Sequence, residues 1–316
     1  MKNLVIVIVS LVFTIKANAQ KEVFKVIASS GNISVLTNPN QPWASVSAGS
    51  KLNDGDRIRI TGTGYLSMLH STGKAIELRK EGDYSVSELS KNISSTNTGI
   101  SNRFANYVLK EISKTDNNNL SGSITRQMAI TGAVERGASD FTIQVNMPRN
   151  TNLIDTIVSF NWQKIANAKG YVFTLSDKFA KVVLTREIID TLFTLNLKNL
   201  NLEPEDYYYW SVSSKNNPNQ ISSEYTINIL SAKTQSTLID SLSILARELG
   251  ENKTAISNLI FASFFEQHKI MNRAMESYKE AIRLEQSSDD YKKAYALFLI
   301  RNGMFNQAKQ MWEGRN

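Results

Sequence analysis

The chain has 316 residues, with 36 Lys and Arg against 29 Asp and Glu, two His and no Cys, so its formal net charge at pH 7 is +7. The absence of Cys excludes disulfides, thiolate metal sites, Cys nucleophiles and a lipidated N-terminal Cys. The basic excess is spread along the chain rather than gathered in one cluster, which argues against a nucleic-acid partner. The length fits two or three domains.

The N-terminus has the three parts of a secretory signal. Lys2 gives a positive start, residues 4–15 form an apolar run, and small residues precede a cleavage point between Ala19 and Gln20. We therefore expect residues 1–19 to be a signal peptide that is removed on export. The apolar run is short for a membrane span, and its retention as an anchor is the alternative. We expect no transmembrane segment after cleavage.

Residues 20–90 alternate polar and apolar side chains over short stretches that glycines separate. Two of these stretches are 56–60 and 74–78. Alternation with a period of two between glycines predicts short β-strands. The strands recur about every ten residues, which suits a small β-sandwich, barrel or solenoid.

Several motifs in this region follow one another in the order found in a known family. The motifs are GNISV at 31–35, GSKL at 49–52, GDRIRI at 55–60, YLSML at 65–69, GKAIEL at 73–78 and GDY at 82–84. Over residues 26–88 the chain resembles the extracytoplasmic domain of FecR-type proteins, which implies an all-β domain. FecR proteins relay signals from outer-membrane receptors to cytoplasmic sigma factors, a role that needs a cytoplasmic segment and a membrane span. The cleavable signal departs from that arrangement, so a FecR-type regulator remains an alternative function.

We interpret residues 91–140 as a helix followed by a linker. Phe104, Val108 and Ile112 lie four residues apart, which predicts a helix over 100–113 with one apolar face. A polar loop follows, and residues 127–136 hold a short apolar patch.

Residues 141–235 carry strand-like stretches between polar loops. Trp162 lies on an early predicted strand, and Leu202, Pro204 and Tyr208 stand at offsets of zero, two and six. These residues resemble the core and the tyrosine corner of a fibronectin type III or immunoglobulin-like β-sandwich, in which the tyrosine hydroxyl bonds back to the chain. The aromatic run 207–210 raises the alternative of a platform for a cell-wall glycan or polysaccharide. Neighbouring side chains on a strand point to opposite faces, so at least one face of this run belongs to the core.

Residues 236–316 have apolar residues at helical spacing and repeat with a period of 34. The spacing predicts helices over 237–249, 255–268, 271–285, 289–302 and 305–314. Small and large residues coincide when the sequence is shifted by this period. Ala262, Phe265, Ala274 and Tyr278 of the first unit fall on Ala296, Leu299, Ala308 and Trp312 of the second, and Ala281 completes the pattern of the first unit.

These positions resemble a tetratricopeptide (TPR) array of two repeats. The resemblance implies a concave surface that binds protein partners. The residues that it places on that surface are Ile256, Leu259, Ser263, Glu266, Lys293, Leu297 and Ile300. The chain departs from the family pattern at Gln286, where a proline is usual, and at Arg315, where a small residue is usual. The alternatives are a plain pair of helical hairpins, and packing of several groove residues against another part of the chain.

No catalytic motif stands out in the sequence. His70 and His268 lie in different predicted domains, and no HExxH, GxSxG or P-loop pattern occurs. A carboxylate pair for glycoside hydrolysis has no fixed spacing, so the sequence leaves that reaction open. We expect no cofactor and no metal site.

Together these patterns predict a multidomain α+β protein with an N-terminal all-β domain, a middle β-sandwich and C-terminal helical hairpins. The expected function is a non-catalytic scaffold, exported to the periplasm or the cell surface of a Gram-negative bacterium, that binds envelope proteins. Glycan binding and FecR-type signalling are the alternatives.

Overall fold

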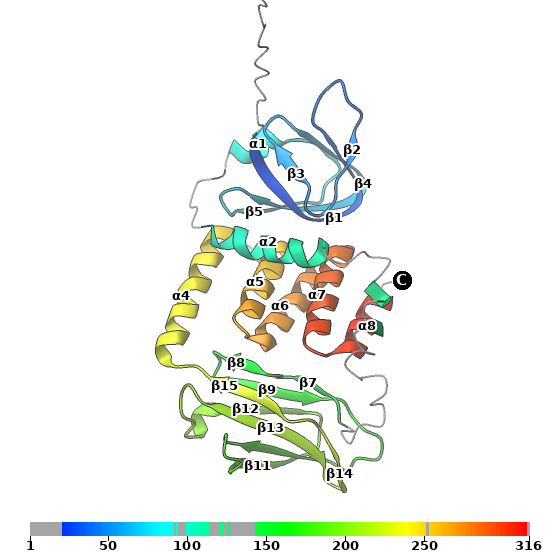
Figure 1. The fold of residues 1–316 in the computed structure, drawn as a ribbon. Coiled ribbons are helices and arrows are strands. Elements are labelled where there is room, and N and C mark those ends of the chain that lie inside the picture. Colours follow the sequence, from blue (N-terminus) through cyan, green and yellow to red (C-terminus); the bar gives the residue numbers. More distant parts are fainter. Residues whose placement is uncertain are drawn as a thin grey trace, which may run out of the picture.

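The computed structural model describes residues 21–91, 93, 99–113, 120–122, 125–126, 143–250 and 253–314. β-Strands lie within residues 22–85 and 145–229 and helices occupy most of 232–313, so the predicted α+β class is confirmed. Figure 1 shows the helices as a middle layer between two β structures. The predicted signal peptide and the apolar patch at 127–136 lie outside the described residues.

The first β structure is a single antiparallel sheet. Its strands are β1 (Glu22–Leu36), β2 (Ala44–Ser45), β3 (Lys51–Asn53), β4 (Arg57–His70), β5 (Ala75–Leu78) and β6 (Gly82–Ser85), followed by helix α1 (Val86–Lys91). The path runs β2-β1-β4-β5, with β3 on β1 and β6 on β4. Gly31, with φ of +82°, faces Gly64 where the long strands bend. A Cβ at Gly31 would lie 2.3 Å from the Thr63 carbonyl oxygen, so this bend requires glycine.

The helical layer comprises α2 (Ile100–Ser113), α4 (Ala232–Leu249), α5 (Ala255–Gln267), α6 (Met271–Leu284), α7 (Asp289–Arg301) and α8 (Phe305–Glu313). Four of these helices match their predicted bounds to within one residue, α2 matches them fully, and α4 begins five residues earlier than predicted. Ser231, Thr254 and Ser288 cap α4, α5 and α7 through side-chain oxygens that accept backbone N–H groups. The nine small and large positions that define the 34-residue period are all buried.

The second β structure consists of two sheets packed face to face. Its elements are β7 (Val145–Met147), β8 (Thr151–Leu153), β9 (Ile157–Trp162), β10 (Tyr171–Ser176), β11 (Val182–Ile188), β12 (Leu192–Asn196), the 3-10 helix η3 (Leu197–Asn199), β13 (Tyr207–Ser214), β14 (Asn217–Ile221) and β15 (Tyr225–Ile229). One sheet has the order β11-β10-β13-β15-β8, with β14 on β13, and the other has the order β12-β9-β7. Phe160, Phe173 and Trp210 meet between the sheets, with ring centroids 4.8 to 5.7 Å apart.

The aromatic run on β13 divides between core and surface. Tyr208 and Trp210 are buried, whereas Tyr207 is 52% exposed and Tyr209 is half-buried. The Tyr208 hydroxyl accepts a hydrogen bond of 2.7 Å from the Glu203 backbone N–H, as the corner motif predicts. Because Tyr208 and Trp210 belong to the core, the four aromatic side chains of the run do not form one platform on the surface.

The apolar core of the helical layer continues into both β structures. Ile27, Tyr65 and Leu69 of the first sheet and Met147 of β7 belong to the same buried cluster as the helices. Helix α2 precedes the sandwich in sequence but packs within the helical layer, against α4, α5 and α7 (Figure 1). Within the described ranges, no helix has the length and apolar character needed to cross a bilayer.

Both histidines are predicted to make the fold sensitive to mild acid. Burial lowers the pKa of His70, helped by Lys21, and burial lowers the pKa of His268, helped by Arg103, both from the usual value of 6.5. As pH falls through 6.5, the unfolded chain therefore takes up protons before the folded chain does, and stability decreases. The free energy of unfolding should drop between pH 7 and about pH 5.5.

The test is urea unfolding at both pH values for the native chain, for the single variants His70→Gln and His268→Gln, and for the double variant. The drop should shrink in each single variant and nearly vanish in the double variant. A double variant with the full native drop would contradict this assignment.

Candidate functional site

The predicted groove residues lie under another part of the chain. Ile256, Leu259 and Ser263 are 0% exposed, Glu266 is 7% exposed and Lys293 is 5% exposed. Leu297 and Ile300 are partly buried and pack against the same core. In this structure these residues pack against another part of the chain, which is the alternative that the sequence left open; whether the face binds a partner stays a prediction. The residues gather on one face of α5 and α7, but that face is covered.

Helix α2 is the element that covers this face. Its residues Phe104, Val108 and Ile112, four apart, are buried in the core of the helical layer. The Phe104 ring meets the Phe264 ring of α5 edge to face at 5.2 Å. The Ser263 hydroxyl donates a hydrogen bond of 3.1 Å to the Phe104 carbonyl oxygen. An amphipathic helix seated in this way is a recurring mode of peptide recognition, here between two parts of one chain.

A buried ionic network joins α2, α5, α6 and α7. Glu266 accepts two hydrogen bonds from the Arg301 guanidinium, at 2.7 and 3.0 Å, and one from the Tyr278 hydroxyl at 2.8 Å. Arg301 also donates to Glu111 of α2 at 3.1 Å. Burial, followed by the Glu266 charge, raises the pKa of Tyr107 to about 12 and raises that of Tyr278 well above its usual value. The Glu266 carboxylate is thus matched by a cation and by neutral hydroxyl donors.

The first sheet contacts the N-terminal ends of α5 and α7. Glu77 of β5 accepts hydrogen bonds from the Ile256 N–H at 3.0 Å and from the Tyr65 hydroxyl at 2.8 Å. A carboxylate at a helix N-terminus offsets the positive end of the helix dipole. The Tyr65 hydroxyl also lies 2.7 Å from that of Tyr291 on α7.

The sandwich holds the opposite ends of the helices. The Lys269 carbonyl oxygen accepts hydrogen bonds from the Asn152 N–H at 2.8 Å and from the Thr151 hydroxyl at 3.0 Å. Arg273 of α6 forms a two-pronged ion pair with Asp155, at 2.6 and 2.8 Å. Polar contacts on both sides therefore fix the helical layer between the two β structures.

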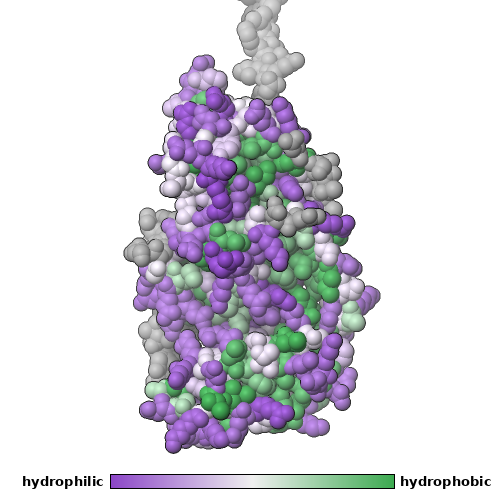
Figure 2. Space-filling view, turned by 180° about the vertical axis from the view of Figure 1, so that it is seen from behind, coloured by the Kyte–Doolittle hydropathy of each residue, from purple (hydrophilic) through white to green (hydrophobic). Residues whose placement is uncertain are grey.

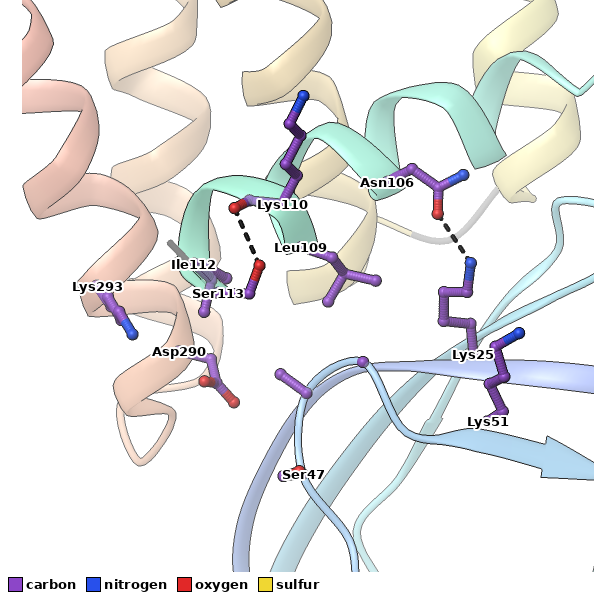
Figure 3. A pocket seen from close by; sticks show the side chains of 12 residues that line it. Lys25, Ser47, Lys51, Asn106, Leu109, Lys110, Ile112, Ser113, Asp290 and Lys293 are labelled. Atoms are coloured by element: carbon purple, nitrogen blue, oxygen red, sulfur yellow. Dashed lines mark hydrogen bonds between the residues drawn. The ribbon is translucent and has the colours of Figure 1, made fainter. Parts of the chain in front are cut away.

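A cavity of about 540 Å³ opens between the first sheet, α2 and α7. Figure 3 shows its amino groups and its carboxylate, contributed by Lys25, Lys51, Lys110, Lys293 and Asp290. Their charges are partly matched within the chain. Glu22, close by, pairs with Lys51 at 2.9 Å and lies 3.7 Å from Lys25, and Asp290 accepts the Ser29 N–H at 3.2 Å. Burial raises the pKa of Asp290. Part of the positive charge around this cavity is therefore compensated within the chain.

Apolar side chains are exposed along one edge of the sandwich. Strand β11 ends one sheet and β12 ends the other, and they follow one another in the chain. We call this surface the sandwich edge; its large exposed apolar residues are Phe179, Val182, Val183, Ile189 and Leu192, on β11, on β12 and in the turns beside them. Figure 2 shows green apolar patches among polar side chains over the lower part of the molecule, where the sandwich lies in Figure 1.

Strand β11 is poorly suited to continue its sheet into another chain. Leu184 faces Leu175 and Val182 faces Ser176, so Val183 is an extra residue that forms a bulge. Arg186 and Glu187 add charges to the same strand. Bulges and charges are the features by which natural edge strands avoid strand addition. A partner at the sandwich edge would therefore meet side chains rather than backbone.

The described residues contain no cluster of three or more His, Asp or Glu that could hold a metal ion. No protein-family profile matches the chain, and no curated protein matches it. Among solved structures, a match with 13% sequence identity and a TM-score of 0.20 is the Clostridium perfringens spore cortex lytic enzyme SleM. It covers 28% of this chain and 27% of that enzyme, and this likeness is too low to bear on the fold or the function.

The Glu266 network should contribute strongly to stability. Removing one partner of a buried ion pair leaves the other charge uncompensated, which costs about 3–5 kcal/mol. Glu266→Ala should therefore lower the free energy of unfolding by about that amount, and Glu266→Gln by less, because the amide still accepts a hydrogen bond from Tyr278.

The matched control is Glu280→Ala, which breaks the exposed pair between Glu280 and Arg283 on α6 and should have little measurable effect. Denaturant unfolding measures all three variants. Equal effects of Glu266→Ala and Glu280→Ala would show that the network does not hold the helical layer together.

Proposed function

We propose that this chain is a non-catalytic scaffold of the bacterial cell envelope that binds other envelope proteins. In this proposal a FecR-like domain, a fibronectin type III or immunoglobulin-like sandwich and a TPR-like array act as one unit. The proposal retains the cleavable signal before Gln20 and a place in the periplasm or on the cell surface. It includes no cofactor and no nucleic acid.

The observation that carries the proposal is the helix-in-groove packing of α2. Phe104, Val108 and Ile112 enter the face formed by α5 and α7, so this face has the shape and chemistry to hold an amphipathic helix. In the folded chain that place belongs to α2. An outside partner is therefore expected first at surfaces that the chain leaves open.

The sandwich edge is the surface that best suits such a partner. Phe179 is 80% exposed and Ile189 is 93% exposed, whereas most other large apolar side chains in the described residues are buried or partly buried. Exposed large apolar groups on neighbouring parts of a protein surface commonly mark an interaction site. The polar contacts between the layers keep this edge in a fixed place relative to the helices.

The test is site-specific photo-crosslinking in intact cells. A photoreactive residue at Val183 or Leu192 should crosslink to a discrete envelope protein, and that product should be lost when Phe179→Asp is introduced. A photoreactive residue at Leu297 should crosslink to α2 within the same chain. Ile239 on α4, an exposed apolar residue away from the sandwich, is the matched control and should give no product.

Three outcomes separate the possibilities. A partner captured at Val183 or Leu192 supports the scaffold proposal and locates its surface. A partner captured at Leu297 would show that α2 leaves the groove in the cell. Absence of any intermolecular product at these positions, in cells whose mature chain begins at Gln20, would contradict the proposal.

A further inference from the structure

A second cavity lies where the sandwich meets the turns between α5 and α6 and between α7 and α8. Its volume is about 490 Å³, and the side chains that matter here are those of Arg149, Tyr225, Lys269, Arg301 and Asn302. No Asp or Glu is among its lining residues. The cavity is therefore surrounded by cationic and neutral groups.

Arg149 is a buried cation without an acidic partner. Its side chain belongs to a residue that is 8% exposed, and its Nη atoms donate to the Asn302 carbonyl oxygen at 3.2 Å and to the Tyr225 hydroxyl at 2.6 Å. Both acceptors are neutral. Its Nε has no hydrogen-bond partner among the residues that the structure describes, and no Asp or Glu lines the cavity beside it.

The other arginine at this cavity provides a direct contrast. Arg301 is neutralised by Glu266 and Glu111. Burial of a cation is costly unless an anion compensates it, and buried charges in proteins are normally paired. In the described ranges Arg149 has neutral partners, which are the Asn302 carbonyl oxygen, the Tyr225 hydroxyl and the Tyr225 ring at 4.8 Å from its guanidinium carbon, and no acid lines the cavity beside it.

We propose that this cavity binds a carboxylate, with Arg149 as its main contact and Lys269 as a second cation at the rim. A guanidinium is a planar fork of N–H donors that matches the two oxygens of a carboxylate. Lys269 is exposed at the turn that follows α5. The carboxylate belongs either to a small organic acid or to the C-terminus of a peptide. This site is separate from the sandwich edge, so failure of one proposal leaves the other standing.

The test uses the mature chain labelled with ¹⁵N-arginine, in which the buried Nε–H of Arg149 is assigned by comparison with Arg149→Lys. The probes are N-acetylalanine, its neutral amide, and an acetylated tetrapeptide with a free C-terminus. Ionic strength is held constant, because screening alone alters charged contacts. The carboxylate probes should shift the Arg149 Nε–H signal with saturation, and the amide should not.

Two variants separate binding from a purely structural role of Arg149. Lys269→Gln, at an exposed turn, should leave the fold intact and should weaken carboxylate binding by up to roughly tenfold. Arg283→Met on α6, which removes a cation far from the cavity, should leave binding unchanged. If Arg149→Lys fails to fold, Lys269→Gln and the amide probe still decide the question, with the signal assigned by elimination.

The outcomes are decisive in either direction. Tighter binding of the tetrapeptide assigns the site to a chain terminus, whereas equal binding of both carboxylates assigns it to small organic acids. No shift with either carboxylate, an equal shift with the neutral amide, or equal binding by Lys269→Gln would overturn the proposal and leave Arg149 as a clamp between Asn302 and Tyr225.

Discussion

The packing of α2 against α5 and α7 is the contact on which the rest of the structure depends. A helix of 14 residues is marginal on its own in water, so its apolar face must be buried to keep it folded. By filling the groove, α2 also buries Glu266, which is tolerable because Arg301 and Tyr278 bond to its carboxylate. The apolar packing of α2 therefore depends on the ionic network that compensates the buried Glu266 carboxylate.

This contact also makes one unit out of parts that differ in secondary structure. The ends of α5 and α7 that lie nearest the first sheet meet Glu77 and Tyr65, and the turn after α5 meets Thr151 and Asn152 of the sandwich. Inter-domain interfaces within a chain often permit relative motion. Here a continuous apolar core and polar contacts at both ends oppose such motion. A fixed arrangement would suit the scaffold role that we propose.

The sequence predicted local features well because their causes are local. The period of 34 gave the helices of the C-terminal part, since small and large residues mesh only at that interval. The corner motif gave the hydrogen bond to the Tyr208 hydroxyl, since the offset from Leu202 sets the geometry. The amphipathic pattern of 100–113 gave α2 and its apolar face.

The sequence could not predict contacts between residues that are far apart along the chain. An apolar face at Phe104 shows that a helix is buried but not what it is buried against, so the sequence left open whether the groove residues face a partner or another part of the chain. Alternation along β13 could not show which face is core until the second sheet was seen to cover Trp210. Nothing around Arg149 in the sequence marks it as buried or as lacking an acidic partner, because the groups that surround it come from residues far along the chain.

Hydrogen exchange of the α2 amides tests the central claim most directly. In the mature chain under native conditions, the amides of residues 104–112 should be protected to the same degree as those of α5, because both belong to one packed unit. Rapid exchange throughout α2, while α5 and α7 stay protected, would contradict this account and would show that the groove is open in solution.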